Sequence, residues 1–234
     1  MMEKLCNHSL GSLSGAGIIR TPVGDGTFIY SVNEGREQHP IKRVSYDDAT
    51  DFCEWRGLVE GVTLTLPTEA QWERAAAWDP LLQHHWKFAY QSDSSILTSA
   101  NWQGSSDPWE NGGSTTRTTP VGFYDGTVHQ EADWDWPGPQ SSYATDDAKT
   151  FHGARDMTGN VQEWCFDWFS SGYYQSYVNQ GSPPDPTGPK SGTLRVVRGG
   201  SWSHSSGFTT GARSPSGPSS RDNRTGFRCV SLTP

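Results

Sequence analysis

The stretch Leu194–Val230 reads LRVVRGGSWSHSSGFTTGARSPSGPSSRDNRTGFRCV, and it decides how the rest of the chain can be interpreted. Its ends, Leu194–Val197 and Phe227–Val230, are apolar enough to predict two strands. The residues between them are mainly Ser, Thr, Gly, Arg, Asp and Pro, and beyond Trp202 the only large apolar side chain is Phe208. Such a segment cannot bury a core. It predicts a loop-rich surface held between fixed ends.

The composition of the whole chain limits what that surface can be attached to. The chain has 234 residues, enough for one large domain or two small ones, but only 32% are hydrophobic. It contains 26 Gly, 15 Pro and 11 Trp, so much of its burial must come from aromatic rings and much of its structure from loops. The net charge of −8 and the lack of a long basic run argue against nucleic acid or an anionic membrane as partner.

Targeting signals and cysteine spacing give further expectations. No run approaches the ~18 apolar residues of a membrane helix, and no signal-peptide pattern is present, so a cytoplasmic or virion-associated protein is expected. Cys6, Cys53, Cys165 and Cys229 show no CxxC spacing, which makes a zinc site unexpected and predicts free thiols.

Two helices are predicted from capping and periodicity. Ser45 can cap the first, at about residues 45–57, with Asp47 and Asp48 in its first turn. Thr68 and Gln71 form a capping box for the second, at about residues 68–78. Residues 24–32 predict a strand. Residues 83–154 lack periodicity, so we expect aromatic packing or ions to hold them, with their acidic residues mostly in solvent: Asp107, Glu110, Glu131, Asp133 and Asp135.

Seven motifs occur in an order that resembles a known family. They are VSYDDATDFCEW (44–55), LPTEAQWERAA (66–76), SANWQG (99–104), TTPVG (118–122), DMTGNVQEWCFDW (156–168), RVVRGGSW (195–202) and GFRCV (226–230). Together they resemble the formylglycine-generating, or sulfatase-modifying-factor, family. The resemblance implies an α+β, C-type lectin-like fold with two helices, short strands and long loops. We expect one such domain over residues 1–234, without the family's usual portion ahead of residue 5.

The resemblance does not extend to the copper site of the formylglycine-generating enzymes. Those enzymes place two copper-binding cysteines, five residues apart, just after the GGSW motif. The matching positions here are His204 and Thr209. A Cu(I) site needs soft thiolate ligands, so we expect no copper and no enzymatic activity.

Two other family features carry over residue by residue. The resemblance implies a structural calcium ion at Asp156, Gly159, Val161 and Glu163, through carboxylates and backbone carbonyls, which are ligands that Ca²⁺ accepts. Alternatively, Asp156 caps a turn and Glu163 pairs with an arginine. A second family calcium site would begin at Asn101. Cys53 and Cys229 match positions that are often disulfide-bonded in the family, which predicts proximity but leaves their oxidation open.

A scaffold without copper ligands suggests a role in binding. Lectin-like domains of this family also serve as variable proteins of diversity-generating retroelements, in which codons near the C-terminus are rewritten at adenines. The residue mixture in Leu194–Val230 is what randomised Asn codons would leave, and this predicts a variable ligand-binding region at 194–230. The alternative is a non-variable family member, either an inactive structural domain or an oxidoreductase with altered chemistry.

The predicted ligand is a protein or another macromolecule, and neither its identity nor the oligomeric state follows from the sequence. The predicted solvent-exposed patch that binds it consists of Ser203, His204, Ser205, Ser206, Phe208, Thr210, Ser216, Ser219, Asp222, Asn223 and Arg224. Phe208, Arg224 and His204 are its expected anchors, because interface energy concentrates in a few aromatic or arginine side chains.

Overall fold

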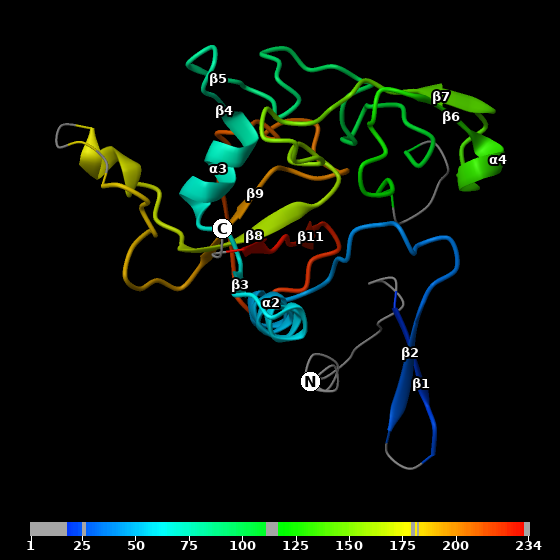
Figure 1. Ribbon diagram of the computed structural model, residues 1–234, viewed down its shortest axis with the longest axis horizontal. Helices are drawn as coiled ribbons and strands as arrows, with labels where there is room; N and C mark the ends of the chain where they lie inside the picture. Colours follow the sequence, from blue (N-terminus) through cyan, green and yellow to red (C-terminus); the bar gives the residue numbers. More distant parts are fainter. Residues whose placement is uncertain (1–17, 25–26, 111–116, 179–180, 182, 232–234) are drawn as a thin grey trace.

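The computed structural model describes residues 18–24, 27–110, 117–178, 181 and 183–231 (Figure 1). At its centre lies a four-stranded sheet in the order β10-β9-β8-β11. Strands β8 (Gln162–Trp168) and β9 (Arg195–Arg198) are antiparallel, with Glu163 opposite Arg198. The strand predicted at residues 194–197 is therefore confirmed, and the DMTGNVQEWCFDW motif supplies its neighbour.

After β9 the C-terminal segment contributes three short strands, where one was predicted. Strand β10 (Ser214–Ser216) pairs antiparallel with β9, inside a stretch predicted as loop, because an edge strand tolerates proline and short length. The strand predicted at Phe227–Val230 is instead divided into β11 (Thr225–Gly226), parallel to β8, and β12 (Val230–Ser231), which pairs with β3 (Leu64–Thr65). Between them, the Phe227 ring packs on Phe52 and the Arg228 guanidinium donates to Glu163.

Both predicted helices are present. Helix α2 (Tyr46–Glu60) begins at a capping box formed by Ser45 and Asp48, and it runs three residues beyond the predicted end because left-handed Gly61 closes it. Helix α3 (Glu69–Ala77) begins at the predicted Thr68 and Gln71 box. None of the helices in the described part of the chain is long and apolar enough to cross a bilayer.

The remaining elements are short. The hairpin of β1 (Ile18–Pro22) and β2 (Phe28–Val32) extends away from the main sheet in Figure 1. Of the strand predicted at 24–32, residues 28–32 form β2, and residues 25–26 lie outside the described residues. The other elements are β4 (Trp78–Asp79), β5 (His84–His85), β6 (Val128–Gln130), α4 (Glu131–Trp134), β7 (Ser142–Ala144) and the 3-10 helix η2 (Tyr174–Tyr177).

Aromatic packing holds the long irregular region between β5 and β8, as predicted. Phe123 packs against Trp109, Tyr124 and Trp136 with ring centroids 4.9–6.3 Å apart. Asp107 does not lie in solvent as expected. It is fully buried, because its carboxylate accepts hydrogen bonds from the backbone of Trp109 and from the hydroxyl of Tyr124 and so serves as an internal turn cap.

Candidate functional site

The segment between β9 and β11 is attached to helix α3 by buried ion pairs. Arg213 donates two hydrogen bonds to the buried carboxylate of Glu69, at 2.6 and 2.7 Å, and a third to the carbonyl of Ser170. Arg198 is fully buried and pairs with Glu73 and Glu69. Bidentate arginine–carboxylate pairs fix geometry as well as charge, so this end of the segment is rigidly positioned.

Two members of the predicted ligand-binding patch are not on the surface. Phe208 is 5% exposed and stacks on Trp102 with centroids 5.0 Å apart. Thr210 is also buried and donates its hydroxyl to the Trp86 carbonyl at 2.6 Å. Their predicted exposure is wrong. Phe208 gains about 2–3 kcal/mol by entering a nearby aromatic cluster. Thr210 can be buried because its hydroxyl has a hydrogen-bond partner. Gly200 allows this approach: a Cβ on it would lie 2.3 Å from Phe208 Cβ.

The other members of the patch remain accessible, and the structure divides them between two areas. Ser205, Ser206 and Ser219 are exposed, and the rest are partly buried: Ser203, His204, Ser216, Asp222, Asn223 and Arg224. Burial and then the nearby Arg224 lower the pKa of His204, while Asp222 opposes them, so the loop at 203–206 lies close to 222–224. Ser216 instead lies in β10, which pairs with β9. Just before Ser219, the carbonyl of Pro218 accepts a hydrogen bond from the backbone N–H of Tyr46.

His204 and Thr209, the two positions that match the copper cysteines, lie on this segment, and neither is a soft ligand. His204 Nδ1 lies 2.7 Å from Ser201 Oγ, and Ser203 Oγ lies 3.3 Å from the same atom. Ser201 is fully buried, so this serine–histidine pair cannot reach a substrate as a nucleophile. Thr209 lies between buried Phe208 and Thr210, and the chain has no cysteine between Cys165 and Cys229. The segment therefore offers no thiolate to a metal.

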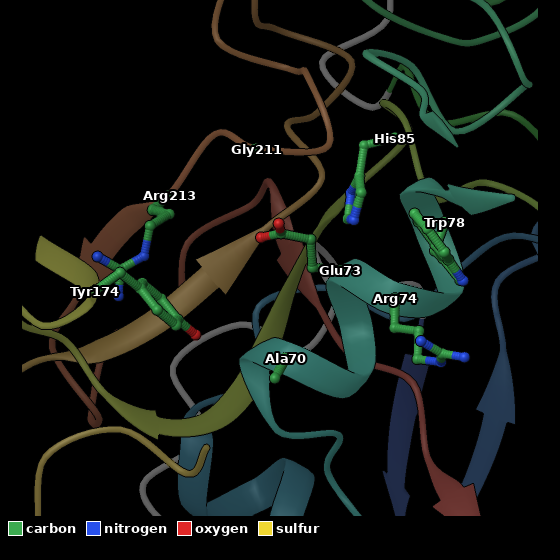
Figure 2. A pocket seen from close by; sticks show the side chains of 8 residues that line it. All are labelled: Ala70, Glu73, Arg74, Trp78, His85, Tyr174, Gly211 and Arg213. Carbon is green, nitrogen blue, oxygen red and sulfur yellow. The ribbon is translucent and has the colours of Figure 1, made fainter. Parts of the chain in front are cut away.

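Next to the segment is a cavity of about 360 Å³ that the sequence did not predict (Figure 2). It lies between α3, the β4–β5 turn, η2 and the chain at 211–213, and Figure 2 shows the carboxylate of Glu73 directed toward the Gly211 side. Its lining residues are Ala70, Glu73, Arg74, Trp78, His85, Tyr174, Gly211 and Arg213. The sequence signal that could have pointed to this side of α3 is the pair Glu69 and Glu73. They are four residues apart on a predicted helix, and that spacing places both carboxylates on one face.

The predicted calcium ligands lie on the turn that leads into β8. Asp156, Gly159 and Asn160 have left-handed φ values of 58°, 80° and 57°. A Cβ on Gly159 would lie 2.0 Å from the Asn101 carbonyl oxygen, so the turn requires glycine there. Within the described chain, no N–H donates to the carbonyl oxygens of Gly159 or Val161. Two buried carbonyls without donors are what a cation site would use.

The two carboxylates of the set already have protein partners. Asp156 Oδ2 accepts the Gly122 N–H at 2.6 Å, and Glu163 accepts two 2.6 Å hydrogen bonds from Arg228 and one from Trp72. These contacts are the ones expected from the alternative to a calcium site, in which Asp156 caps a turn and Glu163 pairs with an arginine. Among the described residues they leave Glu163 Oε1 with one hydrogen bond and Asp156 Oδ1 with none, so these two oxygens can still accept, and the calcium site stays a prediction.

Burial dominates the electrostatics of this turn. Burial raises the pKa of Asp156 to about 6, and the neighbouring Glu163 carboxylate raises it further, against the opposing effect of Arg228. The described residues contain no cluster of three or more His, Cys, Asp or Glu side chains arranged to hold a metal. A site made of two carboxylates and two carbonyls would not form such a cluster, so that absence leaves the calcium site a prediction.

Comparison with known proteins places the chain among related domains. The model of the sulfatase-modifying factor enzyme 1-like domain matches residues 19–232. The chain is 32% identical over 201 residues to the formylglycine-generating enzyme of Streptomyces coelicolor, covering 84% of this chain and 54% of that enzyme. It is 30% identical over 224 residues to that of Thermomonospora curvata, covering 90% and 60%. The chain thus spans little more than half the length of these relatives.

Solved structures agree on the fold. Treponema denticola variable protein 1 superimposes with a TM-score of 0.60 at 22% identity, over 85% of this chain and 73% of that one. The α+β, C-type lectin-like fold predicted from the motifs is therefore confirmed. Because the family model covers nearly the whole chain, this protein belongs to the sulfatase-modifying factor enzyme 1-like, or formylglycine-generating-enzyme-like, domain family.

Proposed function

We propose that this protein is a non-enzymatic member of the family that binds a macromolecular ligand, a protein, through the surface between β9 and β11. The observation that carries the proposal is how this segment is built. Phe208, Thr210 and Arg213 are anchored in the interior, while the side chains left at the surface are small and polar. A rigid frame with adaptable surface residues is the design of a recognition surface.

The surface that would contact the ligand is smaller than the sequence suggested. It comprises Ser203, His204, Ser205 and Ser206 on one loop and Asp222, Asn223 and Arg224 on the next. Arg224 is held by Asp222 through two 2.8 Å hydrogen bonds from its guanidinium, which reduces the entropy it would lose on binding. Because Phe208 is buried, His204 and Arg224 remain as the candidate anchors.

The finer proposal is that residues 194–230 are diversified by a retroelement. The Treponema denticola protein is named as a variable protein, and its structural similarity to this chain supports the same use of the fold. Deep sequencing of the gene in a growing population tests the proposal. We expect substitutions at adenines within codons 194–230 and none in codons 44–76, which encode the two-helix region. Equal variation in the two regions would favour a non-variable family domain.

The main competing function is oxidation chemistry, because curated relatives of this chain are named as formylglycine-generating enzymes. His204 and Thr209 supply one imidazole and one hydroxyl in place of two thiolates, and this supports the absence of copper chemistry. Incubation with Cu(I), oxygen and a cysteine-containing peptide is the test. We expect no aldehyde product. The His204→Cys, Thr209→Cys double variant should bind copper if the two positions match the family's thiolates.

We also propose a structural calcium ion at Asp156, Gly159, Val161 and Glu163. The carbonyls of Gly159 and Val161, which no described N–H approaches, support this proposal. The ion would tie the 156–161 turn to β8, next to the Glu163–Arg228 pair, and so steady the strand that borders β11. No substrate is expected to reach it.

A further inference from the structure

The cavity of about 360 Å³ beside helix α3 lies between two aromatic walls. One wall consists of the rings of Trp78 and His85, whose centroids are 5.0 Å apart, and Tyr174 forms the opposite wall (Figure 2). Between the walls lies Ala70, whose side chain is small enough to leave the space open. A cavity of this volume is at the small end of ligand pockets, so it takes one side chain or one small molecule.

Glu73 gives this cavity a carboxylate with one oxygen still free. Its Oε2 accepts a hydrogen bond from the buried Arg198, and its side chain is 37% exposed. Among the described residues, no N–H or O–H donates to Glu73 Oε1. Figure 2 shows the carboxylate between the two walls, whereas the side chain of Arg74 extends to the other side, away from Tyr174. The free oxygen can therefore accept a hydrogen bond from a group that enters the cavity.

The charged groups behind the cavity leave an excess of negative charge. Three carboxylates, those of Glu69, Glu73 and Asp167, face two guanidinium groups. Arg213 is bound to Glu69 through two hydrogen bonds, and Arg198 is shared between Glu69 and Glu73. Asp167 is buried and accepts the backbone N–H of Glu69, but its Oδ1 has no partner in the described part of the chain. A positive ligand group would offset this excess.

The hydroxyl of Tyr174, which lines the cavity, is affected by the same charges. Burial raises the pKa of Tyr174, and the carboxylates of Glu69, Asp167 and Glu73 raise it further, while Arg213 opposes them. The hydroxyl donates toward Glu69 Oε2 at 3.5 Å, so its oxygen can still accept. The cavity therefore offers a second acceptor in a negative environment.

We propose that this cavity binds a primary ammonium group, the end of a lysine side chain on the protein ligand. An ammonium is a compact charge with three N–H donors, and Glu73 Oε1 and the Tyr174 hydroxyl both line the cavity as acceptors. A guanidinium fits less well, because it binds a carboxylate through both oxygens, and Arg198 occupies one oxygen of Glu73.

Gly211 also lines the cavity, so the lysine would contact the segment between β9 and β11. That the lysine belongs to a protein ligand rests on the proposed function, whereas the binding of an ammonium group does not.

Titration of the full chain with Nα-acetyl-lysine methylamide, followed by proton–nitrogen NMR, tests the site at about pH 7.5, where carboxylates and ammonium are both charged. We expect saturable shifts of the backbone N–H signals of Ala70 and Gly211. Glu73→Gln keeps an oxygen for Arg198 but loses the charge, so it should weaken binding about tenfold or more. The matched control Glu54→Gln, at an exposed position of α2, should bind like the wild type.

A second variant, Ala70→Leu, fills the cavity without changing the Glu73–Arg198 pair. It should abolish binding, followed through the Gly211 signal, and it carries the test if Glu73→Gln does not fold. Binding that is unchanged in these variants would place the lysine analogue elsewhere on the molecule and contradict the proposal.

Three results with the wild type would also overturn the ammonium site. They are no saturable shift, equal shifts from the uncharged Nα-acetyl-norleucine methylamide, and tighter binding of Nα-acetyl-arginine methylamide. Sequencing of the gene in a growing population tests the proposed function separately. A non-variable protein that binds the lysine analogue would contradict the proposed function alone, and a variable protein that does not bind it would contradict the ammonium site alone.

Discussion

The sulfur atoms of Cys53 and Cys229 lie 2.9 Å apart and join helix α2 to the chain between β11 and β12. Both thiols are free in this structure. Their contact lowers the pKa of Cys229 and raises that of Cys53, because one thiol donates to the other. The proximity predicted from the sequence is confirmed.

Oxidation should link this pair and stabilise the fold. The two cysteines are 176 residues apart in sequence, so a bond between them would constrain the unfolded chain by up to about 5 kcal/mol. Mild oxidation should therefore raise the melting temperature, and dithiothreitol should reverse the gain. Cys229→Ser should show neither effect. A mapped disulfide that involves Cys165 would contradict the prediction, because that thiol is fully buried away from the others.

Calcium removal should destabilise the protein. EGTA is expected to lower the melting temperature by several degrees, because it removes a ligand bound only to the native state. Asp156→Asn keeps an acceptor for the Gly122 N–H but loses the carboxylate charge, so it should abolish the effect of EGTA. Asp133→Asn, at an exposed position, is the matched control and should leave the effect intact. An unchanged melting curve, with no calcium found by elemental analysis, would show that the turn holds no ion.

Asp107 should make stability fall as pH rises. Burial raises its pKa from 3.8 to about 6, so the folded state binds a proton that the unfolded state has already lost. Stability therefore decreases between about pH 4 and pH 6 and is level above that range. Asp107→Asn should reduce this decrease by about 3 kcal/mol, measured by urea unfolding at several pH values.

The control for this titration is Asp133→Asn, because Asp133 is exposed. Its pH profile should match that of the wild type. Asn at position 107 can still accept the backbone N–H groups of Trp109 and Glu110, so folding should be retained. If the fall of stability with pH is unchanged in Asp107→Asn, another buried carboxyl group must be responsible. Burial also raises the pKa of Asp156 and that of Asp167 to about 6.

Phe208→Ala should be costly for stability. The ring is buried against Trp102 and Phe88, and deletion of a buried phenylalanine costs about 3–5 kcal/mol. Leu58→Ala, in which the exposed leucine of α2 is truncated, should change stability by less than about 0.5 kcal/mol. Chemical denaturation measures both. If Phe208→Ala loses little unfolding free energy, the side chain is not buried in the core, and Phe208 belongs to the ligand-binding patch as the sequence predicted.

The sequence alone determined the starts of the two helices, the central strand and the family. The capping boxes at Ser45 and Thr68 fixed the starts of both helices, because a cap depends on residues three apart in the chain. The seven ordered motifs identified the C-type lectin-like fold, and Val196 and Val197 marked the central strand through β-branched, apolar side chains. Such signals are contained within a few neighbouring residues.

Only the tertiary structure decided which side chains are buried. Phe208 and Thr210 lie in a polar stretch, and Asp107 lies in an acidic one, so their neighbours in sequence predicted exposure. Their burial depends on partners far away in the chain, such as Trp86 for Thr210 and Tyr124 for Asp107. Burial is a property of the packed chain, because the free energy of removing a group from water depends on what surrounds it in three dimensions.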